Sequence, residues 1–314
     1  MIKAARRASH IAAKFCGVFL FTVFVPVPAF AQEYGEVPYV PTPQNIVDKM
    51  LDVARVGPKD YVIDLGSGDG RLIITAAKKY GARGFGVDLD KELVRRANAL
   101  AAKAGVAERA KFYARDLFKT DFRPATVITI YLLPEVNLMV RPKLLALRSG
   151  TRIVSHDYDM GEWTPDLSFV LDAPDKPVGR DHKSKVFYWV VPAKASGKWR
   201  WQLPAGGKPQ VFELALNQKF QHIEGTLAVD GRKAGIADAK LAGAGVSFSA
   251  TVKHNGASVR YQFSGRISGD TIKGQARIVR DQAEQHYAWH ATRTEHWEPA
   301  HASLPPPSPP PTGY

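Results

Sequence analysis

The hydrophobic positions of this chain follow different periods in its two halves. Between residues 44 and about 193, short apolar runs alternate with stretches whose apolar residues recur at helical spacing, as at Ile46, Met50, Leu51 and Ala54. This alternation predicts a parallel sheet covered by helices on both faces. The expected helices are one that begins near Thr42-Pro43 or Asn45, then 71–80, 91–104 and 135–147; the expected strands are 61–65, 84–88, 111–114, 126–132 and 151–155.

Two later runs, 169–172 and 186–191, complete this sheet as a hairpin, which makes seven strands. From Gly197 onward the apolar residues alternate with period two, for example at Phe212, Leu214 and Leu216. Turn residues at 230–231, 255–256 and 268–270 separate such runs, as expected for antiparallel hairpins. The second half therefore predicts an all-β barrel or sandwich, with Trp199 and Trp201 on one face of a strand, in the core or at the barrel edge.

A glycine-rich stretch, DLGSGDGR (64–71), directly follows the first predicted strand. A P-loop would end in Gly-Lys-Ser/Thr, and a dinucleotide-binding loop would have a third glycine at position 71, where Arg71 stands. The remaining pattern, an acid followed by glycines at 66, 68 and 70, resembles class I S-adenosylmethionine (SAM) methyltransferases. The resemblance implies that Asp64 faces the ammonium group of SAM and that backbone N–H groups near the helix start face its carboxylate.

Acidic residues also follow the next two predicted strands, at the sheet edge where doubly wound folds bind ligands. Asp88 suits a ribose diol, and its alternative role is the N-cap of the following helix. Asp116 and Leu117 suit adenine, because the acid accepts a hydrogen bond from the exocyclic amine while the apolar side chain packs on the ring; a turn-forming aspartate is the alternative. The joint spacing of these acids and the glycine loop favours a SAM site.

Four segments in order, PYVPTP (38–43), DLGSGDGR (64–71), YLLPEVN (131–137) and VSHDYDM (154–160), resemble the ATP synthase c-subunit lysine methyltransferase family and its bacterial relatives. The resemblance covers roughly residues 38 to 165 and implies a Rossmann-like fold and protein-lysine N-methylation with SAM as donor. The cofactor-binding residues it implies are Asp64, Gly66, Ser67, Gly68, Gly70, Asp88, Asp116 and Leu117, with Tyr39 and Thr42 closing the site from the N-terminal side. The substrate opening it implies is lined by Tyr131, Glu135, Asn137, His156 and Asp157.

The chemistry of lysine methylation narrows the roles of these residues. An amine with an ordinary pKa of about 10.4 must lose a proton before it attacks a methyl group. We expect Glu135 or Asp157 to orient the ammonium group and His156 to accept its proton; a helix-starting glutamate and a structurally bonded histidine are the alternatives. Two other functions stay open, an exported noncatalytic binding protein on a methyltransferase-like scaffold and a small-molecule methyltransferase.

The first 31 residues have the pattern of a secretory signal peptide. Lys3, Arg6, Arg7 and Lys14 precede or begin an apolar run that ends at Val25, and Ala29-Phe30-Ala31 provides a cleavage site. We expect export to the periplasm, with an uncleaved inner-membrane anchor as the alternative; the rest of the chain lies outside the cytoplasm in both cases. This location conflicts with the cytoplasmic synthesis of SAM.

The domain organisation that follows is a signal peptide (1–31), a methyltransferase domain (32–194), an all-β domain (195–297) and a proline-rich tail (298–314). The chain carries a net charge of +13, with the basic excess mostly in the second half, which favours an acidic protein, anionic lipid or envelope polymer as a partner beside the protein substrate. Without a clustered basic run, no nucleic acid is expected as a partner.

The cysteine and histidine residues predict no metal or disulfide chemistry. Cys16, the only cysteine, lies inside the signal peptide, so the mature chain has no thiol. His286 and His290 are four residues apart on a predicted strand, about 13 Å at ~3.3 Å per residue, too far to share one metal ion.

Overall fold

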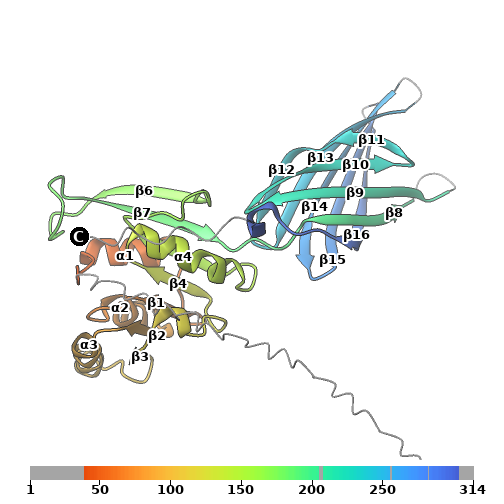
Figure 1. Cartoon of the computed structure of the whole chain (residues 1–314). Coiled ribbons are helices and arrows are strands. Elements are labelled where there is room, and N and C mark those ends of the chain that lie inside the picture. Colours follow the sequence, from red (N-terminus) through yellow and green to blue (C-terminus); the bar gives the residue numbers. More distant parts are fainter. Residues whose placement is uncertain (1–38, 205–207, 255–256, 282, 304–314) are drawn as a thin grey trace, which may run out of the picture. The chain divides into compact units, whose positions relative to one another are not determined.

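The computed structural model describes residues 39–204, 208–254, 257–281 and 283–303. The segment 1–31, where the sequence predicts a signal peptide, and residues 304–314 of the proline-rich tail lie outside this range. The described residues form two sheets, one of seven strands and one of nine (Figure 1).

The seven-stranded sheet has the strand order β3-β2-β1-β4-β5-β7-β6. Strands β1 to β5 pair in parallel, and β7 pairs antiparallel with β5 and with β6. The prediction that the last two apolar runs form a hairpin and complete a Rossmann-like sheet of seven strands is confirmed. The strands are β1 (Tyr61–Leu65), β2 (Arg83–Asp88), β3 (Ala110–Ala114), β4 (Val127–Ile130), β5 (Arg152–His156), β6 (Leu167–Asp172) and β7 (Lys183–Val190).

Four α-helices of the described chain belong to this sheet: α1 (Gln44–Val53), α2 (Arg71–Tyr80), α3 (Lys91–Lys103) and α4 (Pro134–Leu145) (Figure 1). Their apolar faces are buried against the strands, as in α1, where Ile46, Val47, Met50 and Leu51 are fully buried. None of the described helices has both the length and the apolar character needed to cross a membrane.

The strand predicted over 126–132 is shorter in the structure, where β4 ends at Ile130. Pro134 opens α4 at its first position, and Leu133 before it is extended, with φ −63° and ψ 152°. Proline suits the first helical position because its missing N–H would have no partner there, and the residue before a proline avoids the helical region. Tyr131 therefore lies just beyond the carboxyl end of β4.

The strand order places a ligand site at one edge of this sheet. Strand β1 lies between β2 and β4, so the chain runs to one side of β1 first and to the other side later. The loops that follow β1, β2, β4 and β5 all leave from the carboxyl edge, which is the edge at which such sheets bind ligands. Because β7 runs antiparallel to β5, the loop that enters β7 reaches the same edge.

The nine-stranded sheet is antiparallel throughout and has the order β11-β10-β9-β8-β16-β15-β14-β13-β12. Its two ends approach each other, since β10 contacts β12 and β11 contacts β13, so a single sheet curls on itself. The predicted antiparallel all-β unit is confirmed. Its strands are β8 (Gly197–Leu203), β9 (Gln210–Lys219), β10 (His222–Val229), β11 (Arg232–Gly235), β12 (Ala237–Ala242), β13 (Gly245–His254), β14 (Ala257–Ser268), β15 (Thr271–Arg280) and β16 (Ala283–His296).

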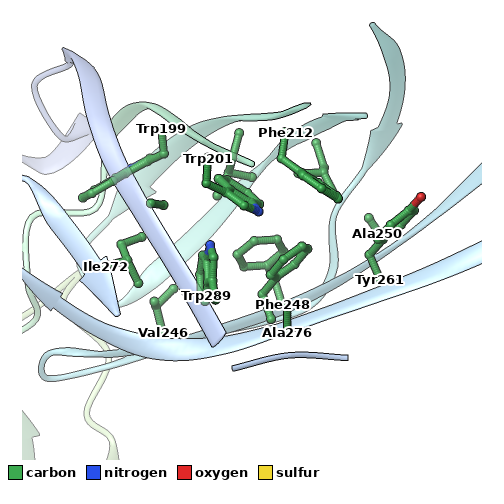
Figure 2. Close-up of a cluster of buried hydrophobic side chains, with 14 of the residues drawn as sticks. Trp199, Trp201, Phe212, Val246, Phe248, Ala250, Tyr261, Ile272, Ala276 and Trp289 are labelled. Carbon is green, nitrogen blue, oxygen red and sulfur yellow. The ribbon is translucent and has the colours of Figure 1, made fainter. Parts of the chain in front are cut away.

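Aromatic side chains fill the inner face of this curled sheet (Figure 2). The ring centroids of Trp201 and Phe212 are 5.3 Å apart, and those of Phe263 and Trp289 are 5.0 Å apart. Trp199 and Trp201 are both buried, so of the two places predicted for them they occupy the core. On the outer side, His286 Nε2 lies 2.6 Å from Glu284 Oε1, and His290 is exposed. No group of three potential metal ligands occurs among the residues that the structure describes.

Candidate active site

The loop between β1 and α2 bends through three glycines in the left-handed conformation. The φ angles of Gly66, Gly68 and Gly70 are +76°, +50° and +82°, values that residues with a Cβ rarely adopt. A Cβ at Gly68 would lie 2.5 Å from the ring of Tyr39, so this ring lies directly on the loop. The structure thus brings Tyr39, from the segment before α1, to the glycine loop.

Asp64 is the fourth residue of β1, and its carboxyl group is buried beside the loop. The hydroxyl of Thr129 in β4 donates to Oδ1 at 2.6 Å. Burial raises the pKa of Asp64 to about 7; the Thr129 hydrogen bond opposes this rise, and the charges of Asp88 and Asp69 add to it. The buried hydroxyl of Ser67 has no hydrogen-bond partner among the described residues. A cationic ligand here would favour the ionised form of this carboxyl group and would meet a hydroxyl that is available.

Arg71 ties the glycine loop to the segment before α1. Its Nε and Nη2 donate to the two carboxylate oxygens of Asp69 at 2.9 Å and 2.7 Å, and its Nη1 donates to the carbonyl oxygen of Thr42 at 2.6 Å. Neither Arg71 nor Asp69 was predicted as a site residue. The one sequence feature that indicates this interaction is the Asp69-Gly70-Arg71 run at the start of a helix, and the same run is also typical of a solvated turn.

Asp88 is the last residue of β2 and Asp116 lies two residues beyond β3, so both are at the carboxyl edge of the sheet, as predicted. Asp88 Oδ2 accepts the amide hydrogen of Gly68 at 2.8 Å, which links the end of β2 to the glycine loop, and its Oδ1 accepts the amide hydrogen of Asp90 at 3.0 Å. The N-cap of α3 is Asp90, not Asp88. Asp116 caps the short 3₁₀ helix Leu117–Lys119 by accepting from the amide of Phe118 at 2.8 Å. Each carboxylate oxygen keeps a second lone pair for a ligand.

Tyr131 and Asp157 meet where β4 and β5 end. The Tyr131 hydroxyl donates to Asp157 Oδ2 at 3.3 Å, and burial together with this carboxylate raises the pKa of Tyr131. Asp157 has a φ of +62°, a strained conformation for a residue other than glycine, and its Oδ1 accepts the amide hydrogen of Lys185 at 3.0 Å. Burial alone would raise the pKa of Asp157, but a hydrogen bond from Lys176 and the charge of His156 lower it below its usual value. Asp157 is therefore ionised at neutral pH.

His156 lies behind this pair and is fully buried. Its Nδ1 is 3.1 Å from the Thr42 hydroxyl and its Nε2 is 2.8 Å from the Ser184 hydroxyl. Burial lowers the pKa of His156 to about 4, although Asp157 opposes this shift, so the ring is neutral at pH 7. Neither ring nitrogen is left to take a proton from a substrate while both hydroxyl contacts persist. The ring packs on Tyr131, with centroids 4.0 Å apart.

Glu135 and Asn137 are placed differently from the other candidates. Asn137 is fully buried, and its Nδ2 donates to the carbonyl oxygens of Tyr158 and Asp159 at 3.2 Å each, which holds the turn after β5. Glu135 lies half-buried in the first turn of α4, where the helix dipole favours a negative charge. In the described structure Glu135 makes no hydrogen bond or ion pair with the other candidate residues.

The residues around the glycine loop fit SAM. The buried carboxyl of Asp64 suits the ammonium group, the available Ser67 hydroxyl suits a further polar group of the ligand, and Asp88 lies where a ribose is expected. When bound, SAM supplies an electrophilic methyl group. Tyr131 and Asp157 lie at the same edge of the sheet; Tyr131 follows β4, the neighbour of β1, and Asp157 follows β5, the next strand beyond β4. The arrangement can therefore hold a methyl donor beside a carboxylate that attracts a cationic acceptor.

Comparison with known proteins agrees with this geometry. Residues 64–167 match the family model of the ANTKMT methyltransferase domain. The chain is 47% identical over 131 residues to a protein-lysine N-methyltransferase of Saccharolobus islandicus (strain REY15A), a match that spans 41% of this chain and 81% of the relative. It is 36% identical over 132 residues to the ATP synthase c-subunit lysine N-methyltransferase of Mus musculus, which spans 41% of this chain and 52% of the mouse protein.

A solved structure also resembles this chain, a Salinibacter ruber protein described as an RNA methyltransferase in complex with S-adenosyl-L-homocysteine. It has 42% sequence identity and a TM-score of 0.44, and it covers 54% of this chain and 99% of the Salinibacter chain. The match to the Saccharolobus relative, over most of that protein's length, is the one that decides the family. The chain belongs to the family of SAM-dependent protein-lysine methyltransferases that contain the ANTKMT methyltransferase domain.

Proposed function

We propose that this chain transfers a methyl group from SAM to the side-chain amine of a lysine in a protein substrate, and that Asp157 receives the ammonium group of that lysine. The observation that carries the proposal is the position of Asp157, an ionised and strained carboxylate at the end of β5, on the same sheet edge as the glycine loop. The names of the Saccharolobus and mouse relatives support lysine as the acceptor.

The residues at this edge have different roles in the reaction. Asp157 attracts and orients the ammonium group, and the half-buried ring of Tyr131 forms an aromatic wall beside it. Removal of the amine from water favours its neutral form, and the proton leaves by way of Asp157 to solvent. His156, with both nitrogens bonded to hydroxyls, holds Tyr131 and the end of β5 in place. Alignment of amine and donor supplies most of the acceleration, up to roughly 7–11 kcal/mol.

The test separates donor binding from methyl transfer. Calorimetry should show that the purified protein binds SAM and that Asp88→Ala weakens this binding strongly. With radiolabelled SAM and a cell-envelope lysate, we expect label in protein and methyllysine after acid hydrolysis.

Asp157→Asn should keep its SAM affinity and lose transfer, whereas Asp159→Asn should keep both. Asp159 is a matched control, because it is an exposed carboxylate two residues away whose Oδ1 accepts only the amide hydrogen of Gly161. Label in small molecules alone, or wild-type transfer by Asp157→Asn, would contradict the proposal. SAM binding without any transfer would favour a noncatalytic binding protein.

We propose the periplasm as the location of this activity. Support comes from the basic residues, the apolar run and the Ala29-Phe30-Ala31 site of the N-terminal segment, which lies outside the described residues. Cell fractionation with N-terminal sequencing tests it, because a periplasmic chain that begins at Gln32 is expected. A cytosolic chain that keeps Met1 would show that the apolar segment is not an export signal.

We also propose that the outer face of the nine-stranded sheet binds an acidic partner in the cell envelope. Arg266 of β14 lies opposite Lys273 of β15, and Lys273 lies opposite His290 of β16, so three exposed basic side chains form one row. A hollow of about 480 Å³ on the same face is lined by Lys240 and Arg277 together with Asp238 and several neutral polar side chains, and Arg277 also pairs with Glu284. The double change Arg266→Glu and Lys273→Glu should weaken binding to isolated envelopes at low salt; unchanged binding would exclude this face.

A further inference from the structure

The loop between β6 and β7 brings a lysine of the chain itself to the candidate active site. Residues 173–182 form this loop, which enters β7 at the carboxyl edge of the sheet, beside the end of β5. Its neighbours Pro174, Asp175, Pro177 and Val178 are exposed, but the side chain of Lys176 is only 10% exposed. Lys176 therefore turns inward while the residues on either side of it are solvated.

The ammonium group of Lys176 lies on the carboxylate that we assign to the substrate lysine. Its Nζ is 2.8 Å from Asp157 Oδ2, and it also donates to the carbonyl oxygen of Lys183 at 2.6 Å. The same Oδ2 accepts the hydroxyl of Tyr131. Taking an ammonium group out of water is costly unless it is paired and hydrogen-bonded, so this position is built to hold a lysine cation.

Closure of the hairpin does not require this contact. The exposed pair Lys183 and Asp172, with Nζ 2.7 Å from Oδ1, already joins the two strands where the loop begins and ends. The amide of Ala173 donates to the carbonyl oxygen of His182 at 2.6 Å and closes the loop at its base. The Lys176 ammonium group reaches beyond these links to Asp157, which follows β5 and lies outside the hairpin. Its placement is thus explained by the active site more directly than by the loop.

We propose that Lys176 is a methyl acceptor in cis, so that the chain methylates its own Lys176 when no protein substrate occupies Asp157; this inference rests on the proposed function. The Nζ ammonium group loses one proton through Asp157 to water, and the lone pair so freed forms a bond to the methyl carbon. The carbon–sulfur bond breaks with its electron pair left on sulfur, which yields S-adenosylhomocysteine. The product is a methylated ammonium group on Lys176.

The test uses the full chain with SAM and no added substrate. After proteolysis, mass spectrometry should find one or more methyl groups on the peptide that contains Lys176, with a rate constant that does not depend on protein concentration. Lys176→Arg should abolish this modification, and Asp157→Asn should abolish both this modification and transfer to other proteins. Lys183→Arg is the matched control, an exposed lysine of the same hairpin, and should leave methylation of Lys176 intact.

A second readout needs no SAM. Acetic anhydride should modify Lys176 more slowly than Lys183 in the wild-type protein, and Asp157→Asn should remove this protection, because the ammonium group then loses its buried partner. A chain that methylates other proteins but leaves Lys176 unmodified would overturn the inference and leave the proposed function standing. A chain that binds SAM and modifies neither would overturn both, and a Lys176 acetylated as fast as Lys183 would show that it does not occupy Asp157.

Discussion

The raised pKa of Asp64 predicts that SAM binding releases a proton. Asp64 is buried, with a pKa near 7 in place of the ordinary 3.8. At pH 6 about nine tenths of the free protein would carry a proton on Asp64. An ammonium group bound beside the carboxyl favours its ionised form and lowers this pKa, so binding must expel the proton.

The expected magnitude follows from linkage. Because Asp64 must lose its proton when SAM binds, SAM binding becomes weaker as the pH falls below 7. The binding free energy changes by about 1.4 kcal/mol for each pH unit, which is tenfold in Kd. Between pH 7 and pH 5 the Kd for SAM should therefore rise about fiftyfold, because half of Asp64 is already protonated at pH 7, and above pH 7 it should level off while the ligand ammonium stays protonated. Asp64→Asn should bind SAM nearly as well as the wild type at pH 5, where Asp64 is neutral, and much more weakly at pH 8.

Calorimetry in buffers of different ionisation enthalpy measures this directly. At pH 6 the wild type should release close to one proton for each SAM bound, and at pH 8 close to none. Asp64→Asn should release none at either pH. Thr129→Val is a useful companion, because loss of the hydroxyl that stabilises the ionised form should raise the pKa further and move the transition to higher pH. A wild-type protein that releases no proton at pH 6 would refute the reasoning, since Asp64 would already be ionised without ligand.

Three further predictions concern the glycine loop, the buried histidine and the curled sheet. Gly68→Ala should lower the free energy of unfolding by roughly 1–3 kcal/mol and weaken SAM binding, because its Cβ would meet the ring of Tyr39; Gly57→Ala, with open space around it, should do neither. The pKa of His156 is about 4 in the folded protein against an ordinary 6.5, so between pH 6.5 and pH 4 only the unfolded chain binds this proton. The free energy of unfolding, measured with urea, should therefore fall by about 3 kcal/mol from pH 7 across this window. The fall should be smaller in His156→Gln, which has no group that titrates there. Trp289→Ala should cost roughly 3–5 kcal/mol in unfolding of the nine-stranded sheet and leave the Kd for SAM unchanged; a changed Kd would show that the core of this sheet supports the active site.

Local chemistry explains why so much of the seven-stranded sheet was predictable. The strand 61–65 and the helix 71–80 match the predicted bounds, because a buried apolar run, three glycines and an amphipathic helix each have a local signature. One turn in the second half had no such signal. Phe220 and Gln221 connect β9 to β10, and Phe220 has a φ of +54°, a conformation that the sequence would suggest only for glycine, asparagine or aspartate. Tertiary packing, not turn chemistry, places that residue.

By itself the sequence determined the order of strands and helices along the chain, the bend of the glycine loop and the acids at the carboxyl ends of β1, β2 and β3, since all of these depend on residues close together in the chain. Only the tertiary structure decided which side chains meet at the edge of the sheet. Thr42 reaches His156 across 114 positions, and Asp157 meets Tyr131 and Lys176 because β5 lies between β4 and β7. Lys176 in particular looks like any solvated loop lysine in the sequence. Its burial on Asp157 depends on the antiparallel direction of β7, which no local pattern around Lys176 encodes.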